Sequence, residues 1–428
     1  MPAEKVYQLV SPETFKQKAL YWASKFETAC YFDSNKFKDP YSRFDGLIAA
    51  GAKRFLRGNA GTAFKELSLF LEQNISYLPG FLGYDLKNET EDLKSESPDN
   101  LGFPDLYFFE PVHLIMIQGN RATVQSSYPD EIFRDIENID LAGERNVNFR
   151  GIIQSRLTKT EYIDAVVNLQ HHIHQGEIYE ANFCQEFYSE ESKLNPADAF
   201  LELQRISPAP FSSFFKIGNH YIISATPERF LCRRGNKLIS QPIKGTARRQ
   251  IDPGQDELIK NNLRNNEKEL AENVMIVDLV RNDLTKSAVP GTVRVEELFG
   301  IYSFEQVHQM ISTVVCQPDQ SLTNADIIKN TFPMGSMTGA PKISAMKLIE
   351  RYEKSRRGVY SGTVGYFSPD GDFDFNVIIR TILYNAENAY LSFHVGSAIT
   401  SDSDPEREYE ECLLKAKAIF QLLGKEVS

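Results

Sequence analysis

Four glutamates form two pairs whose spacing could bind a metal ion. Glu269 and Glu272 lie three positions apart in a predicted helix, and Glu408 and Glu411 repeat that spacing near the C-terminus. Residues at i and i+3 project from one face of a helix. If the two faces met, they would form an oxygen-only cage suited to a hard cation such as Mg²⁺. The spacing leaves the alternative open that each pair is a solvated helix face.

A second set of candidates lies in Ser224–Phe230 and Pro242–Thr246. Lys244 lies between Pro242 and Gly245, where we expect an irregular backbone conformation and not a regular strand or helix. A lysine is commonly a solvated charge, but beside Mg²⁺ or other cations its pKa falls and the free amine becomes a nucleophile. Glu228 is then a candidate proton donor to a leaving group. We therefore expect a lowered pKa for Lys244 and general acid catalysis by Glu228.

Three other motifs do not support a site. The segment Gly335–Lys342 has glycines and a lysine, but the spacing differs from that of a P-loop, and its proline lacks the N–H that such a loop needs. No Gly-x-Gly-x-x-Gly follows a predicted strand, which excludes a Rossmann dinucleotide site. The histidines of 171–174 have no further cluster of ligating residues beside them, which favours a helix surface over a metal site.

Composition narrows the class of protein. The 47 basic and 58 acidic side chains give a net charge of −11, which argues against a nucleic-acid partner. Apolar runs such as Val112–Ile117 are far shorter than the roughly 20 residues that span a bilayer, and the N-terminus resembles no secretory signal. Five cysteines without a Cys-x-x-Cys pair are typical of buried thiols in a reducing compartment. We expect a cytoplasmic protein that does not bind membranes.

The predicted elements that must position these residues are numerous short strands and a few helices. Thr158 and Glu161 form a capping-box pattern that begins a helix, and two long helices are expected at about 256–284 and 405–423. Strands often follow one another without an intervening helix, so the fold class is α+β. The strands are expected at 106–109, 113–117, 122–125, 211–217, 221–225, 237–241, 307–315, 362–367, 376–383 and 389–394.

The ordered motifs of roughly residues 155–425 closely resemble those of the chorismate-utilising enzymes. That family includes anthranilate synthases, aminodeoxychorismate synthases and isochorismate synthases. Gly80–Leu86 also looks like the N-terminal region of the two aminating branches. The matching segments are Thr226–Phe230, Pro242–Thr246, Glu267–Asn273, Val277–Leu284, Gly335–Lys342, Arg356–Gly362 and Ile378–Thr381.

The resemblance implies an anthranilate-synthase-like sandwich of two large, mainly antiparallel sheets flanked by helices. Residues 1–150 would be the N-terminal anthranilate synthase component I-like region and 151–428 the chorismate-binding catalytic domain, the two forming one intertwined fold. A charged stretch at Asn138–Arg150 marks the boundary. Chorismate and Mg²⁺ would lie in a cleft between the sheets. The metal ligands would be Glu272 and Glu411, with Glu269 and Glu408 completing or orienting the shell.

The resemblance also implies roles for residues around the substrate. Tyr360 and Arg380 would hold the enolpyruvyl carboxylate, and His308 would lie beside the departing hydroxyl. Gly396 would present backbone N–H groups to a carboxylate, although Ala398 stands where many relatives have glycine. The remaining substrate contacts would be Thr246, Ser397 and Lys415.

The residue at position 244 separates the branches of the family. Anthranilate synthases typically have alanine there. In the branch with Pro-Ile-Lys-Gly-Thr, the lysine is thought to add to C2 of chorismate while the C4 hydroxyl leaves with a proton from the position of Glu228. Ammonia then adds at C4. Isochorismate synthases activate water with a different lysine, about where this sequence has Glu180. The resemblance thus implies synthesis of 4-amino-4-deoxychorismate for 4-aminobenzoate and folate, with Mg²⁺ as cofactor.

The ammonia is expected to come from another protein, and two alternative functions stay open. No Cys-His-Glu amidotransferase domain fits in the 428 residues, so a separate glutaminase subunit is expected. The enzyme alternative is anthranilate synthase component I, whose product carries nitrogen at C2 and which releases pyruvate. The non-enzyme alternative is an inactive subunit that binds chorismate or tryptophan. The joint presence of proton donor, nucleophile and metal ligands argues against it: Glu228, Lys244, Glu272, His308, Arg380 and Glu411.

Overall fold

The computed structural model describes residues 3–73, 75–141, 143, 145–304 and 307–425. Its helices are α1 Pro12–Ala23, α2 Ala63–Leu71, α3 Lys87–Thr90, α4 Pro129–Glu137, α5 Lys159–His174, α6 Pro196–Ile206, α7 Pro253–Arg264, α8 Glu267–Thr285, α9 Asn324–Thr331, α10 Lys342–Tyr352 and α11 Pro405–Leu422. Its strands are β1 Ala3–Gln8, β2 Thr28–Asp33, β3 Gly46–Gly58, β4 Leu78–Leu82, β5 Leu106–Gln118, β6 Arg121–Ser126, β7 Gln154–Ser155, β8 Glu180–Ser189, β9 Phe211–Ile217, β10 His220–Thr226, β11 Arg229–Arg234, β12 Lys237–Gln241, β13 Ile243–Arg248, β14 Arg294–Ser303, β15 Val307–Cys316, β16 Gly339–Ala340, β17 Thr363–Phe367, β18 Phe373–Val377, β19 Thr381–Asn385 and β20 Tyr390–Ile399.

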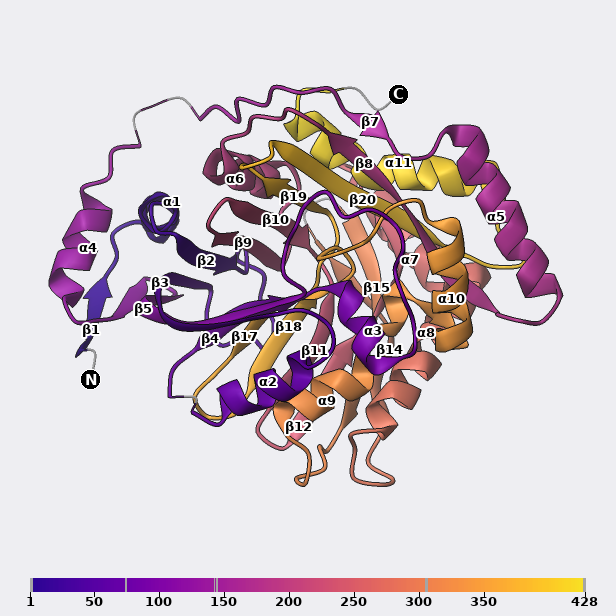
Figure 1. Cartoon of the computed structure of the whole chain (residues 1–428), viewed down its shortest axis with the longest axis horizontal. Coiled ribbons are helices and arrows are strands. Elements are labelled where there is room, and N and C mark those ends of the chain that lie inside the picture. Colours follow the sequence, from indigo (N-terminus) through magenta and orange to yellow (C-terminus); the bar gives the residue numbers. More distant parts are fainter. Residues whose placement is uncertain (1–2, 74, 142, 144, 305–306, 426–428) are drawn as a thin grey trace.

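The strands form two antiparallel layers that share β5. One layer runs β5–β3–β2–β9–β10–β19–β20–β8, and the other runs β5–β4–β17–β18–β11–β12–β15 with β13 and β14 on β15 (Figure 1). Strands β2 and β4 of the N-terminal region pair with β9 and β17 of the C-terminal region. The α+β sandwich is therefore confirmed, with its sheets joined through one long strand. The domain boundary near residue 150 stays a prediction.

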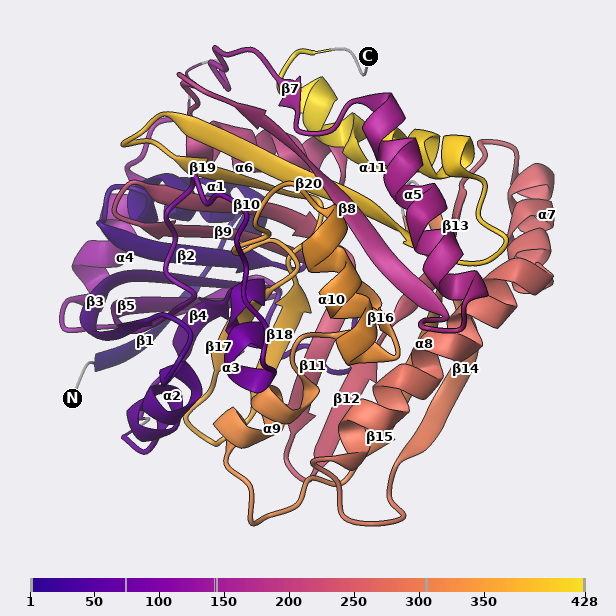
Figure 2. The same cartoon turned by 45° about the vertical axis from the view of Figure 1, so that its right-hand side comes forward.

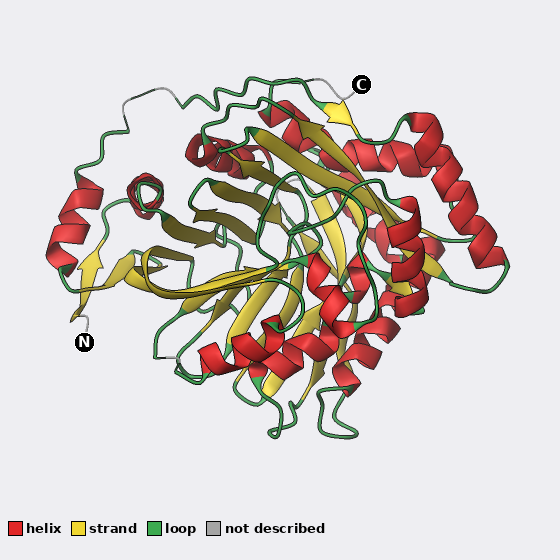
Figure 3. Cartoon of the chain, viewed as in Figure 1, coloured by secondary structure: helices red, strands yellow, loops and turns green. Residues whose placement is uncertain are grey.

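Two large hydrophobic cores lie on the two faces of the first layer. Tyr31 of β2 and Phe214 of β9 belong to the outer core, beneath α1, α5, α6 and α11, while the next residue along each strand faces the opposite way. Phe32 and Phe215 enter the inner core between the two layers. This alternation follows from the two-residue period of a strand. Figure 3 shows the helices gathered on the outside of the strands.

The predicted long helix at 256–284 is wrong, because the chain forms two helices there. α7 ends at Arg264 and α8 begins at Glu267. The side chain of Asn266 accepts a hydrogen bond from the N–H of Glu269, which caps the start of α8. The hydrophobic spacing continues across this cap and conceals it. The capping box at Thr158 and Glu161 is confirmed.

The predicted strand at 376–383 is also wrong, because it divides into β18 and β19. Arg380 has a positive φ of 51° between them, a conformation that side chains other than glycine seldom adopt. The break interrupts the strand at Arg380, whose carbonyl still accepts a hydrogen bond from the N–H of Ala225 on β10. An interrupted strand thus positions one of the predicted substrate-binding residues.

Two sequence expectations concern the state of the cysteines and the presence of membrane-spanning helices. All five cysteines are free and buried, as the sequence predicts. Within the described ranges, no helix combines the length and the apolar character needed to cross a membrane.

Candidate active site

Lys244 lies at an irregularity of β13, where its pairing with β15 shifts register between Ile243 and Thr246. Gly245 has a φ of 94°, and a Cβ there would come within 3.2 Å of Glu269 Oε2, so only glycine fits this turn well. Asn273 of α8 donates a hydrogen bond to the carbonyl of Lys244 and accepts one from Ser312 of β15. These contacts hold the Lys244 backbone between α8 and β15.

The side chain of Lys244 forms a buried ion pair with Glu180, the first residue of β8. The Nζ–Oε1 distance is 3.0 Å, and the two side chains are 13% and 5% exposed. Burial by itself lowers the pKa of Lys244, but the carboxylates of Glu180 and Glu272 outweigh it, so the pKa lies above its usual value. The expected lowering of this pKa is therefore wrong for the protein by itself. These carboxylates come from β8 and α8, and no local sequence pattern places them beside Lys244.

Glu228 lies in the turn between β10 and β11 and is buried. Its N–H donates to Thr226 Oγ1 at 3.3 Å, and its carbonyl accepts from the N–H of Val377. Burial raises the pKa of Glu228 to about 7, against the opposing effects of the Ser336 hydroxyl and nearby cations. Glu228 and Ser336 line the same small pocket. A carboxyl that keeps its proton near neutral pH can serve as a general acid.

Arg380 brings a positive charge to Glu228 from the break between β18 and β19. Burial lowers the pKa of Arg380, while the Glu228 carboxylate acts in the opposite sense. Lys244 and Lys415 also interact electrostatically with Glu228. The structure thus brings together the predicted proton donor, the predicted nucleophile and two predicted substrate-binding cations.

Three of the four predicted metal ligands interact with one another across two helices. Burial raises the pKa of Glu269 on α8, and Glu411 on α11 raises it further. Burial also raises the pKa of Glu272, with added repulsion from Glu269 and Glu180. Figure 2 shows α8 and α11 on the same side of the molecule, with α5, α7 and β13. Negative carboxylates that repel one another in this way form a donor set suited to a hard cation.

The fourth glutamate and the detailed geometry differ from a closed metal cage. Glu408 is buried and interacts electrostatically with Tyr162 of α5. Glu411 forms an ion pair with Lys415 at 2.7 Å. Within the part of the chain that the structure describes, no three His, Cys, Asp or Glu side chains converge to metal-binding geometry. The donor chemistry fits Mg²⁺, but the four glutamates do not form such a group among the described residues.

His308 of β15 bonds to neighbours that the sequence did not suggest. Its Nε2 lies 3.0 Å from Asp256 Oδ1 on α7, and its Nδ1 lies 2.8 Å from Ser303 Oγ. Arg249 in turn donates two hydrogen bonds to Asp256 and holds the pKa of that carboxyl below its usual range. His308 is therefore oriented by Asp256, and its place beside a departing hydroxyl stays a prediction.

The other predicted substrate-binding residues surround β8 and β20. Tyr360 is buried, stacks on His394 at 4.9 Å and points its hydroxyl at Cys184 Sγ. A Cβ at Gly396 would lie 2.4 Å from Cys184 Sγ, so β20 and β8 pack too closely there for any other residue. The Gly396 carbonyl accepts a hydrogen bond from Lys415.

Ser397 and Thr246 are the last two predicted substrate-binding residues. Ser397 Oγ lies 3.3 Å from the Tyr162 hydroxyl. Thr246 is exposed on β13. Neither position tests the roles that the resemblance implies for these side chains.

Comparison with known proteins now places the chain in a family. A family model described as chorismate binding enzyme matches residues 17–421. The chain belongs to the chorismate-binding enzyme family. It is 34% identical over 349 residues to the aminodeoxychorismate synthase component 1 of Escherichia coli strain K12, covering 81% of this chain and 76% of that protein.

Two further relatives show how close the branches of the family are. The anthranilate synthase component 1 of Thermus thermophilus is 33% identical over 358 residues, covering 80% of this chain and 76% of that protein. The crystal structure of anthranilate synthase component I from Streptococcus pneumoniae has the same fold, with a TM-score of 0.77, 24% identity, and coverage of 89% of this chain and 93% of that one. Overall identity therefore does not separate the two aminating branches, and the site residues must.

Proposed function

We propose that the protein aminates chorismate at C4 with ammonia and forms 4-amino-4-deoxychorismate, a precursor of 4-aminobenzoate and folate. The observation that carries this proposal is the largely buried lysine at position 244, which lies within electrostatic reach of a carboxyl whose pKa burial raises to about 7. A nucleophile and a proton donor in one buried site suit a substitution that proceeds through a covalent step. The relative from E. coli, named as an aminodeoxychorismate synthase, supports the same branch.

In this proposal Glu228 donates its proton to the C4 hydroxyl while Lys244 adds to C2. The raised pKa leaves Glu228 protonated in a large share of molecules near neutral pH. The hydroxyl then departs as water, which is a far better leaving group than hydroxide. Ammonia adds at C4 in the second half of the reaction and displaces the lysine. Each half is an easier step than direct substitution.

Two cations and one hydroxyl of the site are proposed to bind chorismate. Arg380 presents a planar guanidinium with several N–H donors, which matches the geometry of a carboxylate. Its charge interacts with Glu228, so a carboxylate held by Arg380 would lie close to the proton donor. Tyr360 is buried beside β8 and is the proposed second donor to that carboxylate. Lys415 interacts with both Glu228 and the Gly396 carbonyl and is proposed to approach the ring.

Glu272 and Glu411, supported by Glu269, are the proposed ligands of Mg²⁺. When bound, the cation would neutralise the ring carboxylate of chorismate, which these glutamates would otherwise repel. Water or the substrate would complete the shell, because no three ligating side chains converge there among the described residues. Glu408 remains a proposed outer member of this group.

Ammonia is proposed to come from a separate glutaminase subunit. The E. coli relative is named as component 1 of its synthase, which is consistent with a second component for that enzyme. Free ammonium salts would replace the partner in solution, because only NH₃ enters the chemistry. The proposed substrates are therefore chorismate and ammonia.

The competing function is that of anthranilate synthase, which the relative from Thermus thermophilus represents. The two reactions differ in one simple measurement, because only the anthranilate route releases pyruvate. We expect the purified protein, given chorismate, Mg²⁺ and ammonium, to consume chorismate without releasing pyruvate in a coupled lactate dehydrogenase assay. Stoichiometric pyruvate and fluorescent anthranilate would replace the proposed function with the competing one.

A further inference from the structure

We propose that Glu180 is a second acid–base residue of the reaction, which takes a proton from Lys244 before the amine attacks and returns it when the lysine departs. This inference rests on the proposed function, since it requires that Lys244 be the nucleophile. It goes beyond the resemblance, which treats this position only as the place of a lysine in another branch of the family.

The contact between the two side chains is direct and well supported. Nζ of Lys244 donates a hydrogen bond to Oε1 of Glu180 over 3.0 Å. Glu180 is buried and begins β8, where its backbone pairs with Ala340 of β16, and the neighbouring Tyr179 N–H bonds to the Ala340 carbonyl. Two rigid strands therefore hold the carboxylate at the reacting nitrogen.

A separate proton acceptor is needed because an ammonium group has no electron pair to attack carbon. The carboxylates around Lys244 favour its charged form in the resting site. Glu228 does not fit this task, because its proton must go to the C4 hydroxyl and it cannot accept another at the same time. Glu180 lies at hydrogen-bond distance from the Lys244 amine and can accept its proton. The two glutamates therefore handle different protons: Glu180 that of the lysine, and Glu228 that of the C4 hydroxyl.

The first half of the reaction balances with both glutamates. Glu180 accepts one proton from the Lys244 ammonium, and the electron pair of the amine forms the N–C2 bond. The two ring double bonds each shift by one position, and the C4–O bond breaks. Glu228 gives its proton to the departing oxygen, which leaves as water.

The second half restores both residues. The electron pair of ammonia forms the N–C4 bond, the double bonds shift back, and the C2–N bond breaks to release Lys244 as a neutral amine. Protonated Glu180 returns its proton to that amine, and ionised Glu228 takes one proton from the new C4 ammonium. Chorismate and ammonia thus yield the C4 amine and water, with no net change in the protein.

The test compares Glu180→Gln with a matched control on the same strand. Glu186 is equally buried on β8 and pairs with Arg156, away from Lys244, so Glu186→Gln controls for removing a buried charge from this strand. Each variant is mixed with chorismate and Mg²⁺ without ammonia, and intact-protein mass spectrometry follows an adduct of the mass of chorismate minus water. Turnover is then measured with ammonium, and chorismate binding by calorimetry.

We expect Glu180→Gln to slow both adduct formation and turnover about 10²–10⁴-fold, as for other losses of acid–base catalysis, with chorismate binding and Glu186→Gln close to wild type. Formate should partly restore turnover to Glu180→Ala, because a small carboxylate can occupy the vacated space and accept the proton. Rescue by formate separates proton transfer from packing, and it remains informative if Glu180→Gln is poorly folded.

Three results are decisive in different ways. Adduct formation by Glu180→Gln at the wild-type rate would overturn the inference, as would loss of activity in Glu180→Ala that formate does not restore. In both cases a wild-type protein that makes the C4 amine leaves the proposed function standing. A wild-type protein that forms no adduct and makes anthranilate would instead overturn the proposed function, and the inference with it.

Discussion

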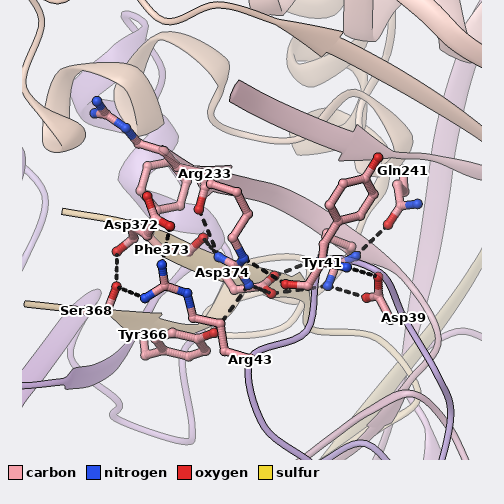
Figure 4. A network of polar contacts seen from close by, with 12 residues as sticks. Asp39, Tyr41, Arg43, Arg233, Gln241, Tyr366, Ser368, Asp372, Phe373 and Asp374 are labelled. Atoms are coloured by element: carbon pink, nitrogen blue, oxygen red, sulfur yellow. Dashed lines mark hydrogen bonds and ion pairs between the residues drawn. The ribbon is translucent and has the colours of Figure 1, made fainter. Parts of the chain in front are cut away.

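Glu228 and Arg229 are neighbours in sequence and both are buried, but their charged surroundings differ. Arg229 has close partners of opposite charge, whereas Glu228 has none within the described part of the chain. Arg229 binds Asp374 through Nε at 2.9 Å and through a second nitrogen at 3.1 Å, pairs with Asp39, and donates to Gln241. Figure 4 shows this network around Asp374. Glu228, by contrast, faces Lys244 and Arg380 at longer range and holds a proton near neutral pH.

The difference separates structural charges from reactive ones. In the network every charge has a close partner, and Arg43 and Arg234 bring further partners to Asp372 and Asp374. Such a set is complete without a ligand and holds β11 against β18. In the site, Arg380 and Glu228 interact at longer range, and the glutamates of α8 and α11 repel one another, as expected where a substrate with two carboxylates and a cation would complete the set.

The largest expected effect comes from Lys244→Ala. Removal of a covalent nucleophile should lower turnover on the order of 10³-fold or more, while chorismate still binds through the remaining cations. Turnover with ammonium and binding by calorimetry check this. Lys237→Ala removes a lysine of the neighbouring strand that pairs with Glu296 and should change neither. Full C4 amination by Lys244→Ala would rule out the covalent route.

The next effect is the loss of the proton on Glu228. Glu228→Gln keeps the shape of the side chain and should lower turnover about 10²–10⁴-fold. In the wild type the rate should fall as the pH rises through about 7, since the acid must be protonated. A pH–rate profile of both proteins checks this: the variant should lose that descending limb, and an unchanged limb would assign it to another group.

Arg229→Met tests the complete network. The substitution removes the cation that Asp374 and the largely buried Asp39 share, while Arg234 still pairs with Asp374. The free energy of unfolding should fall by about 3 kcal/mol. Urea denaturation checks this value. At temperatures where the variant remains folded, its turnover should stay near that of the wild type. A loss of turnover without a loss of stability would show that the network takes part in the reaction.

The smallest expected effect is that of Glu228→Gln on the pH dependence of the free energy of unfolding. Its pKa is raised in the folded state from 4.5 to about 7, so its contribution to stability is fully present below the lower value and is lost as the pH rises through the higher one. Glu228→Gln is neutral at every pH and escapes this loss. Between about pH 4 and pH 8 the variant should therefore gain about 3 kcal/mol over the wild type. An equal difference in unfolding free energy at both pH values would contradict the raised pKa.

The sequence predicted the members of the site better than their partners. Lys244, Glu228 and the glutamate pairs are identified by local patterns and by ordered motifs. Their electrostatic neighbours come from strands far away in the chain, as with Glu180 and Lys244, and no local pattern reports such a pairing. This is why the sign of the Lys244 pKa shift was wrong.

Element type was also easier to predict than element boundaries. The regular leucine and valine spacing of residues 256–284 conceals the cap at Asn266, although an asparagine three residues before a glutamate is a recognised start signal. The break at Arg380 has no such signal. A positive φ at an arginine is unfavourable locally and persists because the surrounding strands determine it.

The most direct test of the central claim is the position of nitrogen in the product. The wild-type protein is incubated with chorismate, Mg²⁺ and ¹⁵N-labelled ammonium, and the product is examined by two-dimensional NMR. The account predicts ¹⁵N bonded to C4, with the enolpyruvyl group still attached at C3. Nitrogen bonded to C2 in an aromatic product that has lost pyruvate would contradict it.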